Sequence, residues 1–464
     1  MPPTLALSLW FIFLVALLRF DPAKSPKTSA ALWVPVIWLF IVGSRLPSQW
    51  FGGGMGQAVE ALEEGDSLDR IVFSALIVLA MGILVSRSYQ WASFLNQNLA
   101  LMALVSYALL SVCWSDFPFV AFKRWFKDLG NYLIILVVLS DPQPVEALRT
   151  TFRRVCYLLV PLSILLIKYY PQDAIHYSFW TGTPEYVGAA TSKNMLGVLC
   201  MVSGIFLFWD IATRWPERKQ RGTKPIILMN IAFAAMTLWL LSLSKSATSR
   251  VCLLIGCLVI AAAHSGICRH RPALLKVLIP LFICLYLILV FGFGVDINAA
   301  VAGAVGRDST LTGRTDIWNA VLSTHTNAFV GAGYESFWLG SRLKEVWAIT
   351  GPGINEAHNG YLEVYLCQGI FGLLLLGGFL IASYRSICKR LTSPSSFGSL
   401  AMALWTILLF YNVTESAFKG QLMWIVFLLG AISVPRGQSV RGRSPIDRLS
   451  LREQPSKLRR AVTV

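Results

Sequence analysis

Long apolar stretches separated by short polar segments run along nearly the whole chain. Residues 71–85, 196–209 and 226–243 approach the ~20 residues that a helix needs to cross a ~30 Å hydrocarbon core. The pattern predicts thirteen membrane spans, several of them short enough that twelve stays open. They lie at about 4–19, 30–45, 70–86, 97–113, 128–140, 155–168, 194–211, 225–243, 250–264, 273–292, 359–384, 398–414 and 420–434. We therefore expect an all-α, polytopic transmembrane protein.

Composition supports this class. The chain is 55% hydrophobic and 14% charged, with a mean hydropathy of +0.61, whereas charged residues make up about a quarter of an ordinary soluble domain. No Lys or Arg precedes the first span and no small-residue cleavage site follows it, which favours an anchor over a signal peptide. We expect one membrane domain over residues 1–434. A basic cytoplasmic tail over residues 435–464 has the composition of a disordered segment.

Basic residues are distributed unevenly between the two sets of connecting segments. If the tail is cytoplasmic, its side of the membrane holds 26 of the 40 Lys and Arg but seven of the 24 acids. This asymmetry follows the positive-inside rule and places the long loop 293–358 outside, together with the N-terminus if there are thirteen spans. The net charge of +16 is therefore mainly a topology signal. It indicates membrane lipids as partners, and no nucleic acid.

A histidine–asparagine pair stands where this outer loop re-enters the membrane. His358 and Asn359 begin the span that carries Gly369 and Gly372. An imidazole can accept and donate a proton near pH 7, so His358 is the candidate general base, with a satisfied interfacial histidine as the alternative. Asn359 either orients the imidazole, binds a substrate or caps the helix. The two glycines predict close helix packing beneath the site.

Several cations fall at the outer ends of spans, where positive-inside bias would not place them. Such cations cost free energy unless they are paired or bind a ligand. Their neighbours in sequence are mostly Ser, Thr, Asn and Gly with few carboxylates, which favours a shared anionic ligand over snorkelling or local ion pairs. Lys193 and Arg314 also stand at expected helix starts, whose free N–H groups attract anions. The candidate anion-binding residues are Arg124, Lys193, Asn194, Lys245 and Arg314.

The outer loop is expected to contain two short amphipathic helices, near 315–323 and 334–347. Trp318, Trp338 and Trp347 argue against disorder, and they suit a sugar face and a membrane interface equally well. The nine cysteines lie in or beside spans without a Cys-x-x-Cys pair, and no Asp-x-Asp occurs. The sequence therefore predicts neither a disulfide framework nor a metal site.

Five short stretches, taken in order, resemble one family. They are Thr191-Ser-Lys-Asn-Met-Leu-Gly197, the turn 241–248, Gly313-Arg-Thr-Asp-Ile-Trp318, Gly331-Ala-Gly-Tyr334, and His358-Asn359 followed after nine residues by Gly369-x-x-Gly372. Over roughly residues 70–430 the chain resembles the O-antigen ligase and exopolysaccharide polymerase (Wzy-like) superfamily of bacterial membrane glycosyltransferases. Lys245 departs from the pattern, because many members carry arginine there. Lysine keeps the charge and loses the bidentate fork.

The resemblance implies a GT-C-like fold in the bacterial inner membrane with its active site at the periplasmic face. The donor would be an undecaprenyl-diphosphate-linked oligosaccharide, and the acceptor a hydroxyl of a glycan or glycolipid. His358 would take the hydroxyl proton, while Arg314, Lys193, Lys245 and Arg124 would stabilise the departing diphosphate. Direct attack would invert the anomeric carbon without a metal or other cofactor. Other polysaccharide export proteins are expected partners.

Four functions are compatible with these residues. A polymerase extends a glycan, an O-antigen ligase passes it to lipid A core, a flippase moves the lipid-linked sugar, and a scaffold does none of these. Residues 31–38 and 44–50 resemble exopolysaccharide-production members and favour the polymerase. A flippase usually carries charges near the bilayer midplane, whereas Lys168, Asp210 and Glu363 lie near the ends of spans. A scaffold would leave the outward cations unexplained.

Overall fold

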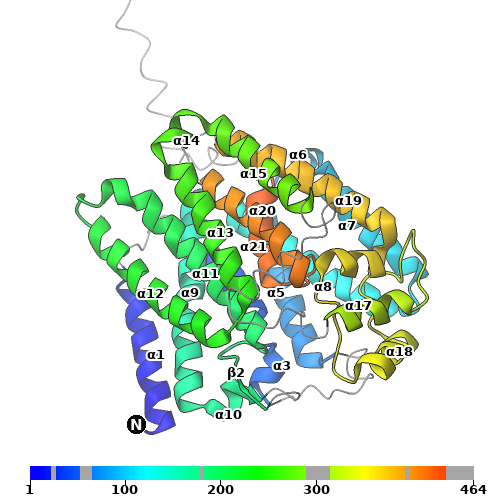
Figure 1. Ribbon diagram of the computed structural model, residues 1–464. Coiled ribbons are helices and arrows are strands. Elements are labelled where there is room, and N and C mark those ends of the chain that lie inside the picture. The colour runs from blue at the N-terminus through cyan, green and yellow to red at the C-terminus, as the bar shows by residue number, and fades with distance from the viewer. Residues whose placement is uncertain (22–27, 53–64, 178–181, 289–313, 392–396, 435–464) are drawn as a thin grey trace, which may run out of the picture.

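The computed structural model describes residues 1–21, 28–52, 65–177, 182–288, 314–391 and 397–434. Figure 1 shows a bundle of helices, and the sheet in these ranges is a two-stranded antiparallel hairpin. The principal helices are α1 (Pro3–Arg19), α2 (Trp33–Val42), α3 (Pro47–Trp50), α5 (Ser67–Ser86), α6 (Trp91–Gln97), α7 (Leu99–Leu110), α8 (Pro118–Leu139), α9 (Pro144–Tyr169), α10 (Pro171–Ala174), α11 (Lys193–Arg214), α12 (Thr223–Ser244), α13 (Ala247–His264), α14 (Gly266–His270), α15 (Pro272–Leu287), α17 (Arg314–Ser323), α18 (Gly340–Thr350), α19 (Gly360–Leu391), α20 (Phe397–Thr414) and α21 (Leu422–Ala431). The strands are β1 (Ile175–Tyr177) and β2 (Pro184–Tyr186). The predicted all-α fold is confirmed.

Every predicted span coincides with a helix, although the helices differ in length. Within the described residues, seven helices are long and apolar enough to cross a membrane, or eight if the bent pair of α6 and α7 forms one span. The helices α1, α2, α15 and α21 are apolar but shorter. The chain is therefore a multi-pass membrane protein. A total of twelve or thirteen spans stays a prediction.

The helices around α11 form the centre of the bundle. α11 packs against α12 and α13, and α20 packs against α13, α19 and α21. Most residues of α9, α11 and α20 are buried, whereas most residues of α5 and α13 are not. Apolar residues on the exposed faces of α5 and α13 suit a hydrocarbon solvent, because lipid tails are as apolar as the side chains themselves.

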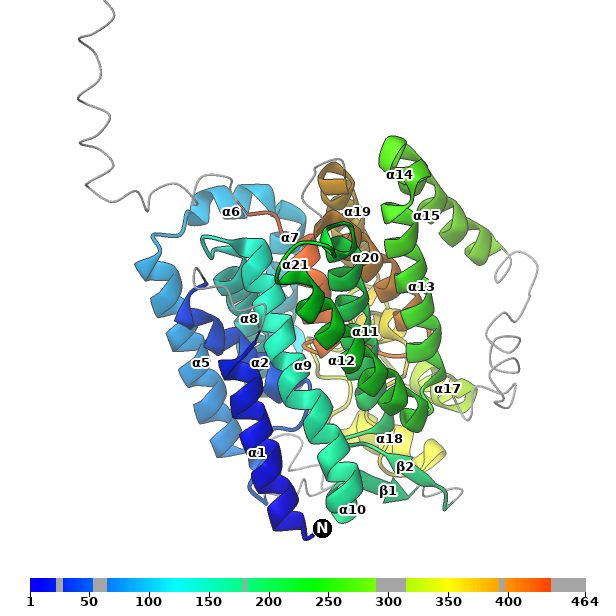
Figure 2. The ribbon, with the colours of Figure 1, turned by 90° about the vertical axis from the view of Figure 1, so that its left-hand side faces the viewer.

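The connecting segments gather at two ends of the bundle. In Figure 2, α6 and α14 lie at the end opposite α10, β1, β2 and α18, as the predicted alternation requires. Several carboxylates of the predicted inner segments form ion pairs. Asp141 lies 3.2 Å from Arg87, and Asp210 lies 3.0 Å from both Arg149 and Arg214. These pairs lower the cost of placing charge at the ends of spans.

Serine N-caps fix the starts of two helices that lead to the candidate site. The hydroxyl of Ser192 accepts a hydrogen bond from the backbone N–H of Met195, and that of Ser246 accepts one from Ser249. Each bond satisfies one of the free N–H groups of a first helical turn. Lys193 therefore begins α11, as predicted from the sequence, and Lys245 ends α12 directly before the cap of α13.

The outer loop contains two short helices, one of them shifted from its expected place. α17 matches the expected 315–323 closely. The second was predicted to begin near 334, but α18 runs from Gly340 to Thr350. Residues before Gly340 form turns, because they pair with the backbone of α19. Residues 293–313 of this loop and the tail 435–464 lie outside the described residues.

Gly369 breaks α19. Its φ of +64° and ψ of −163° belong to a region that is almost restricted to glycine. The break leaves backbone groups of residues 366–371 free to bond the turn before α18. Ala332 and Gly333 donate to the carbonyls of Leu366 and Cys367, both at 2.9 Å. The sequence predicted close packing between helices at this glycine, whereas the close contact is with the loop backbone at Phe329.

We expect Gly369→Ala to lower the folded yield strongly. A Cβ there would lie 2.2 Å from the backbone carbon of Phe329 and would disfavour the observed φ. Gly377→Ala is the matched control, because a Cβ at Gly377 in the same helix meets open space. Size-exclusion profiles and thermal unfolding in detergent would compare the two. Equal behaviour of both variants would contradict this account of the break.

Candidate functional site

His358 stands directly before α19, beside the end of α20. Its φ of +48° lies in the left-handed region that residues other than glycine rarely adopt, and such strain is concentrated at functional sites. The N–H of Gly360 donates to the carbonyl of Glu415 at 2.9 Å. Glycine is required there, because a Cβ would lie 1.9 Å from the Asn412 amide oxygen. This close approach brings His358 to the segment that follows α20.

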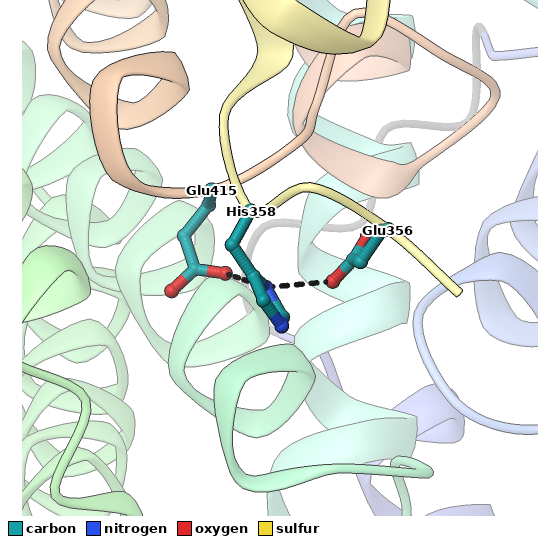
Figure 3. A group of neighbouring side chains, drawn as sticks. All are labelled: Glu356, His358 and Glu415. Carbon is teal, nitrogen blue, oxygen red and sulfur yellow. Dashed lines mark ion pairs between the residues drawn. The ribbon is translucent and has the colours of Figure 1, made fainter. Parts of the chain in front are cut away.

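Two carboxylates flank the imidazole (Figure 3). Nδ1 of His358 lies 3.0 Å from Oε1 of Glu356 and 3.5 Å from Oε2 of Glu415. Both ion pairs end on the same ring nitrogen, and their angles fall short of hydrogen bonds. Within the described part of the chain, neither a hydrogen bond nor an ion pair is formed by Nε2 of His358. A carboxylate on Nδ1 with a free Nε2 is the arrangement that prepares a histidine for proton transfer.

Glu415 connects the predicted site residues. Its side chain is 6% exposed, and Oε1 lies 2.9 Å from Nη2 of Arg314. The amide of Asn194 donates to both carboxylate oxygens, at 3.1 and 3.3 Å. Arg314, Asn194 and His358 come from segments far apart in sequence, so Glu415 is the group on which they converge. The structure therefore brings three of the predicted site residues together, while their binding of a shared anion stays a prediction.

The two flanking carboxylates change the proton affinity of His358. Burial alone would lower the pKa of the imidazole, but Glu356 and Glu415 outweigh it and raise the pKa to about 9. Burial alone would raise the pKa of Glu356, but His358 and Lys419 outweigh it and lower the pKa to about 2. His358 is therefore a cation at neutral pH. His358 can act as a base only in the fraction of molecules in which its imidazole is neutral, or when Glu356 and Glu415 no longer raise its pKa.

Glu356, His358 and Glu415 also have the side-chain types of a metal site. Their ligand atoms lie within 4.8 Å of one another. The carboxylates are already engaged by cations of the chain, however, because Arg314 pairs with Glu415 and Lys419 Nζ lies 3.7 Å from Glu356. A divalent ion would have to bind among these positive groups. The charge distribution fits an anionic ligand better than a metal ion.

The other three predicted cations, Lys193, Lys245 and Arg124, differ in their interaction partners. Lys193 pairs with Glu185 on β2. Lys245 is exposed in the left-handed conformation at the end of α12, with no ion pair among the described residues. Arg124 donates to the carbonyl of Glu335 and lines a neighbouring pocket. The sequence-based expectation of few carboxylates beside these cations was wrong for Arg314 and Lys193, because their partners come from other segments.

Asn359 caps α19. Its Oδ1 accepts a hydrogen bond from the backbone N–H of Leu362 at 3.1 Å, and its Nδ2 donates to the carbonyl of Val413 at 3.3 Å. A contact with the substrate stays a prediction. Asn359→Ala should lower the free energy of unfolding by about 1 kcal/mol, as loss of an N-cap does, whereas Asn359→Ser keeps a capping oxygen. Thermal unfolding of both variants tests this, and equal losses would argue against the cap.

Sequence reasoning missed Glu356, Glu415 and Lys419. The signal was present in 413–420, where Glu415 and Lys419 stand in a short outer turn between two apolar spans. Charge at such a position is costly unless it is paired or functional. The turn was passed over because it carries no motif. The ion-pair partners of Glu415 and Lys419 are Arg314, Glu356 and His358, and the nearest of them, His358, precedes Glu415 by 57 residues (415 − 358).

The fold and the site together define a multi-pass α-helical membrane protein with a His–Glu–Arg cluster at one end of its bundle. The O-antigen ligase family (Wzy_C) matches residues 231–377, which include Lys245, Arg314 and His358 but not Glu415. The chain is 25% identical over 363 residues to the exopolysaccharide production protein ExoQ of Rhizobium meliloti (strain 1021), which covers 72% of this chain and 77% of the relative. These matches confirm the predicted resemblance to the O-antigen ligase and Wzy-like family. They support a function of the ligase or polymerase type in polysaccharide biosynthesis.

Proposed function

We propose that the protein transfers a glycan from undecaprenyl diphosphate to a sugar hydroxyl at the periplasmic face of the inner membrane. The observation that carries the proposal is the convergence of His358, Arg314 and Asn194 on Glu415. This cluster joins a proton-transfer group to fixed positive charge. Such a transfer needs both, since a hydroxyl must lose its proton while a diphosphate departs with negative charge.

His358 would take the proton. The acceptor oxygen forms the new bond to the anomeric carbon, the bond from that carbon to the phosphate oxygen breaks, and the diphosphate leaves with the electron pair. The hydroxyl proton passes to Nε2 of the neutral imidazole, while Nδ1 keeps its proton beside the carboxylates of Glu356 and Glu415. With a pKa of about 9, roughly 1% of His358 is neutral at pH 7. Attack on the side opposite the leaving group inverts the anomeric carbon.

Arg314 would bind the departing diphosphate. A guanidinium has five N–H donors, and Glu415 engages Arg314 through Nη2. The remaining donors can reach a phosphate while Glu415 fixes the orientation of the side chain. Lys193 begins α11 and Lys245 directly precedes the N-cap of α13, and helix N-termini add attraction for an anion. Glu415 is therefore a positioning residue for both the base and the phosphate-binding group.

Chain growth is favoured over transfer to lipid A core. The relative named above is an exopolysaccharide production protein, and the resemblance extends over most of both chains. An O-antigen ligase is the second candidate, because the matching family carries that description. A flippase is less consistent with a cluster built for proton transfer at one end of the bundle.

Reconstitution with a lipid-diphosphate oligosaccharide tests the proposal. A polymerase releases free lipid diphosphate as the glycan lengthens, and NMR of the product shows an inverted linkage. Transfer to a second lipid would identify a ligase. Movement across the bilayer without cleavage of the diphosphate bond would contradict glycan transfer altogether.

We also expect turnover to be unaffected by chelators. The carboxylates that could bind a metal are paired with Arg314 and Lys419, so the proposed mechanism uses cations of the chain alone. Initial rates with EDTA should agree with untreated protein within about twofold, and added Mg²⁺ or Mn²⁺ should not raise them. Loss of activity in EDTA that Mn²⁺ restores would show instead that Glu356, His358 and Glu415 bind a metal.

A further inference from the structure

A pocket adjoins the two segments that carry Glu356 and Glu415. Its volume is about 220 Å³, and its lining includes Asn355 and Ser416. Asn355 precedes Glu356 and Ser416 follows Glu415, so consecutive residues face the His358 cluster and the pocket. A ligand in the pocket would therefore lie beside the proposed point of transfer.

Two polar groups in the pocket wall have no hydrogen-bond partner among the residues that the structure describes. They are Oε1 of Gln368 and Oγ of Ser416, on side chains that are 8% and 3% exposed. A buried polar atom without a partner costs about 1–3 kcal/mol, and native proteins rarely leave one without a reason. Both atoms belong to residues that line the same cavity. The pocket wall therefore contains one acceptor and one hydroxyl that no described residue satisfies.

The second glycine of the sequence motif helps to place Gln368. A Cβ at Gly372 would lie 2.3 Å from Cβ and 3.0 Å from Oε1 of Gln368. Glycine at this position leaves room for the amide one turn earlier in α19. The sequence alone had assigned Gly372 to packing beneath the site. Its contact shows that the packing partner is a side chain of the pocket.

The remaining lining has aromatic surface and balanced charge. Trp338 and Phe418 contribute aromatic rings to the lining. Nε1 of Trp338 donates hydrogen bonds to the carboxylate oxygens of Glu363 at 3.0 and 3.1 Å. Two cations, Arg124 and Lys419, stand with two acids, Glu335 and Glu363, in the same lining. The sum of these charges is zero. Rings beside free hydrogen-bonding groups suit a ligand with both an apolar face and hydroxyls.

We propose that this pocket binds one neutral sugar residue of the glycan, with a sugar hydroxyl donating to Gln368 Oε1 and another bonding Ser416 Oγ. The inference rests on the proposed glycan transfer, since it deepens that function by assigning a place to the sugar. The volume suits a single ring. The position next to Glu356 and Glu415 would hold that ring within reach of His358.

Ser416→Ala and Gln368→Met remove the free polar groups while keeping similar volume. Ser383→Ala is the matched control, because Ser383 is also buried but its hydroxyl donates to the carbonyl of Leu380 at 2.9 Å. The first measurement is saturation-transfer NMR on the detergent-purified protein with methyl glycosides of glucose, galactose and mannose. At least one glycoside should bind, and either pocket variant should weaken it about tenfold or more. Ser383→Ala should bind normally.

The second measurement is steady-state transfer at varied donor and acceptor concentration. A raised KM for the acceptor alone would assign the sugar to the acceptor, and a raised KM for the donor alone would assign it to the donor. Thermal unfolding of Ser416→Ala should be unchanged or improved, because the variant loses an unsatisfied group. Unchanged glycoside binding and unchanged KM in both pocket variants would overturn the inference and leave the transfer activity standing. Glycoside binding that depends on Gln368 and Ser416 in a protein without transfer activity would instead overturn the proposed function and support the pocket.

Discussion

His358→Ala should abolish glycan transfer while leaving the folded yield intact. Loss of a general base costs about 10²–10⁴ in rate, and the side chain is 29% exposed, outside the apolar core. The measurement is kcat/KM for release of lipid diphosphate by purified protein. His325→Ala is the control, because His325 is exposed on the same outer segment and has no part in the cluster. Near-normal turnover of His358→Ala would mean that the histidine is structural.

The same histidine should determine the pH dependence of transfer. If the neutral imidazole is the base, kcat/KM should rise about tenfold per pH unit between pH 6 and 8 and level off near its pKa of about 9. Glu356→Gln removes one of the groups that raise this pKa, so the inflection should move down toward the unperturbed ~6.5. A profile that is flat from pH 6 to 9 would exclude His358 as the proton acceptor.

The contribution of His358 to stability should decrease as the pH rises, whereas the rate of transfer should increase. The pKa of His358 in the folded protein, about 9, exceeds the unfolded value of about 6.5. Its ion pairs therefore contribute fully below pH 6.5, and the contribution is lost as the pH rises through 9. The difference in Tm between the wild type and His358→Gln should shrink over that interval. For Glu356, with a pKa lowered to about 2, the contribution is present above pH 4.5 and is lost as the pH falls toward 2.

The fold was predictable because the thickness of the hydrocarbon core sets the number of apolar residues that a membrane-spanning helix needs. Each apolar stretch became a helix, and serine caps at Ser192 and Ser246 set two of their starts. The start of α18 was not predictable, because turns before Gly340 bond to α19 across the break at Gly369. A helix broken by one glycine in an apolar run has the same sequence pattern as a continuous one.

The candidate site was predictable only in part, for a related reason. His358 and Arg314 stood out because each is a polar residue at the start of an expected helix. Glu415 did not, although it contacts both, because a carboxylate among many outer acids carries no motif. Arg314 begins α17 and Glu415 directly follows α20, 101 residues later in the sequence. Their contact arises only when the helices pack into the bundle. Arg314 and Lys193 consequently looked free in the sequence, and both are paired in the structure.

The second large expected effect is weaker donor binding when Arg314 or Lys193 is replaced. If Arg314 and Lys193 bind one diphosphate, neutral substitution of either should weaken donor binding by ~1.5–3 kcal/mol, roughly 10- to 150-fold. Arg314→Lys should also be impaired, since a point charge cannot reproduce two parallel N–H bonds. Arg342→Gln is the control, because Arg342 forms an ion pair with Asp116, and neither residue is part of the cluster. Donor affinity of the reconstituted variants is the measurement.

Glu185 separates a ligand-binding role of Lys193 from a structural one. Lys193 pairs with Glu185, so Glu185→Gln frees the ammonium without removing it. If Lys193 binds phosphate, Glu185→Gln should leave donor affinity unchanged or raise it, while Lys193→Gln lowers it. If the ion pair merely holds β2 against α11, both variants should lose the same stability and the same affinity. The double variant Arg314→Gln with Lys193→Gln should be non-additive when both side chains act on one ligand. Small, additive effects at the two positions would mean separate surface charges, and the diphosphate would have to bind elsewhere on the outer face.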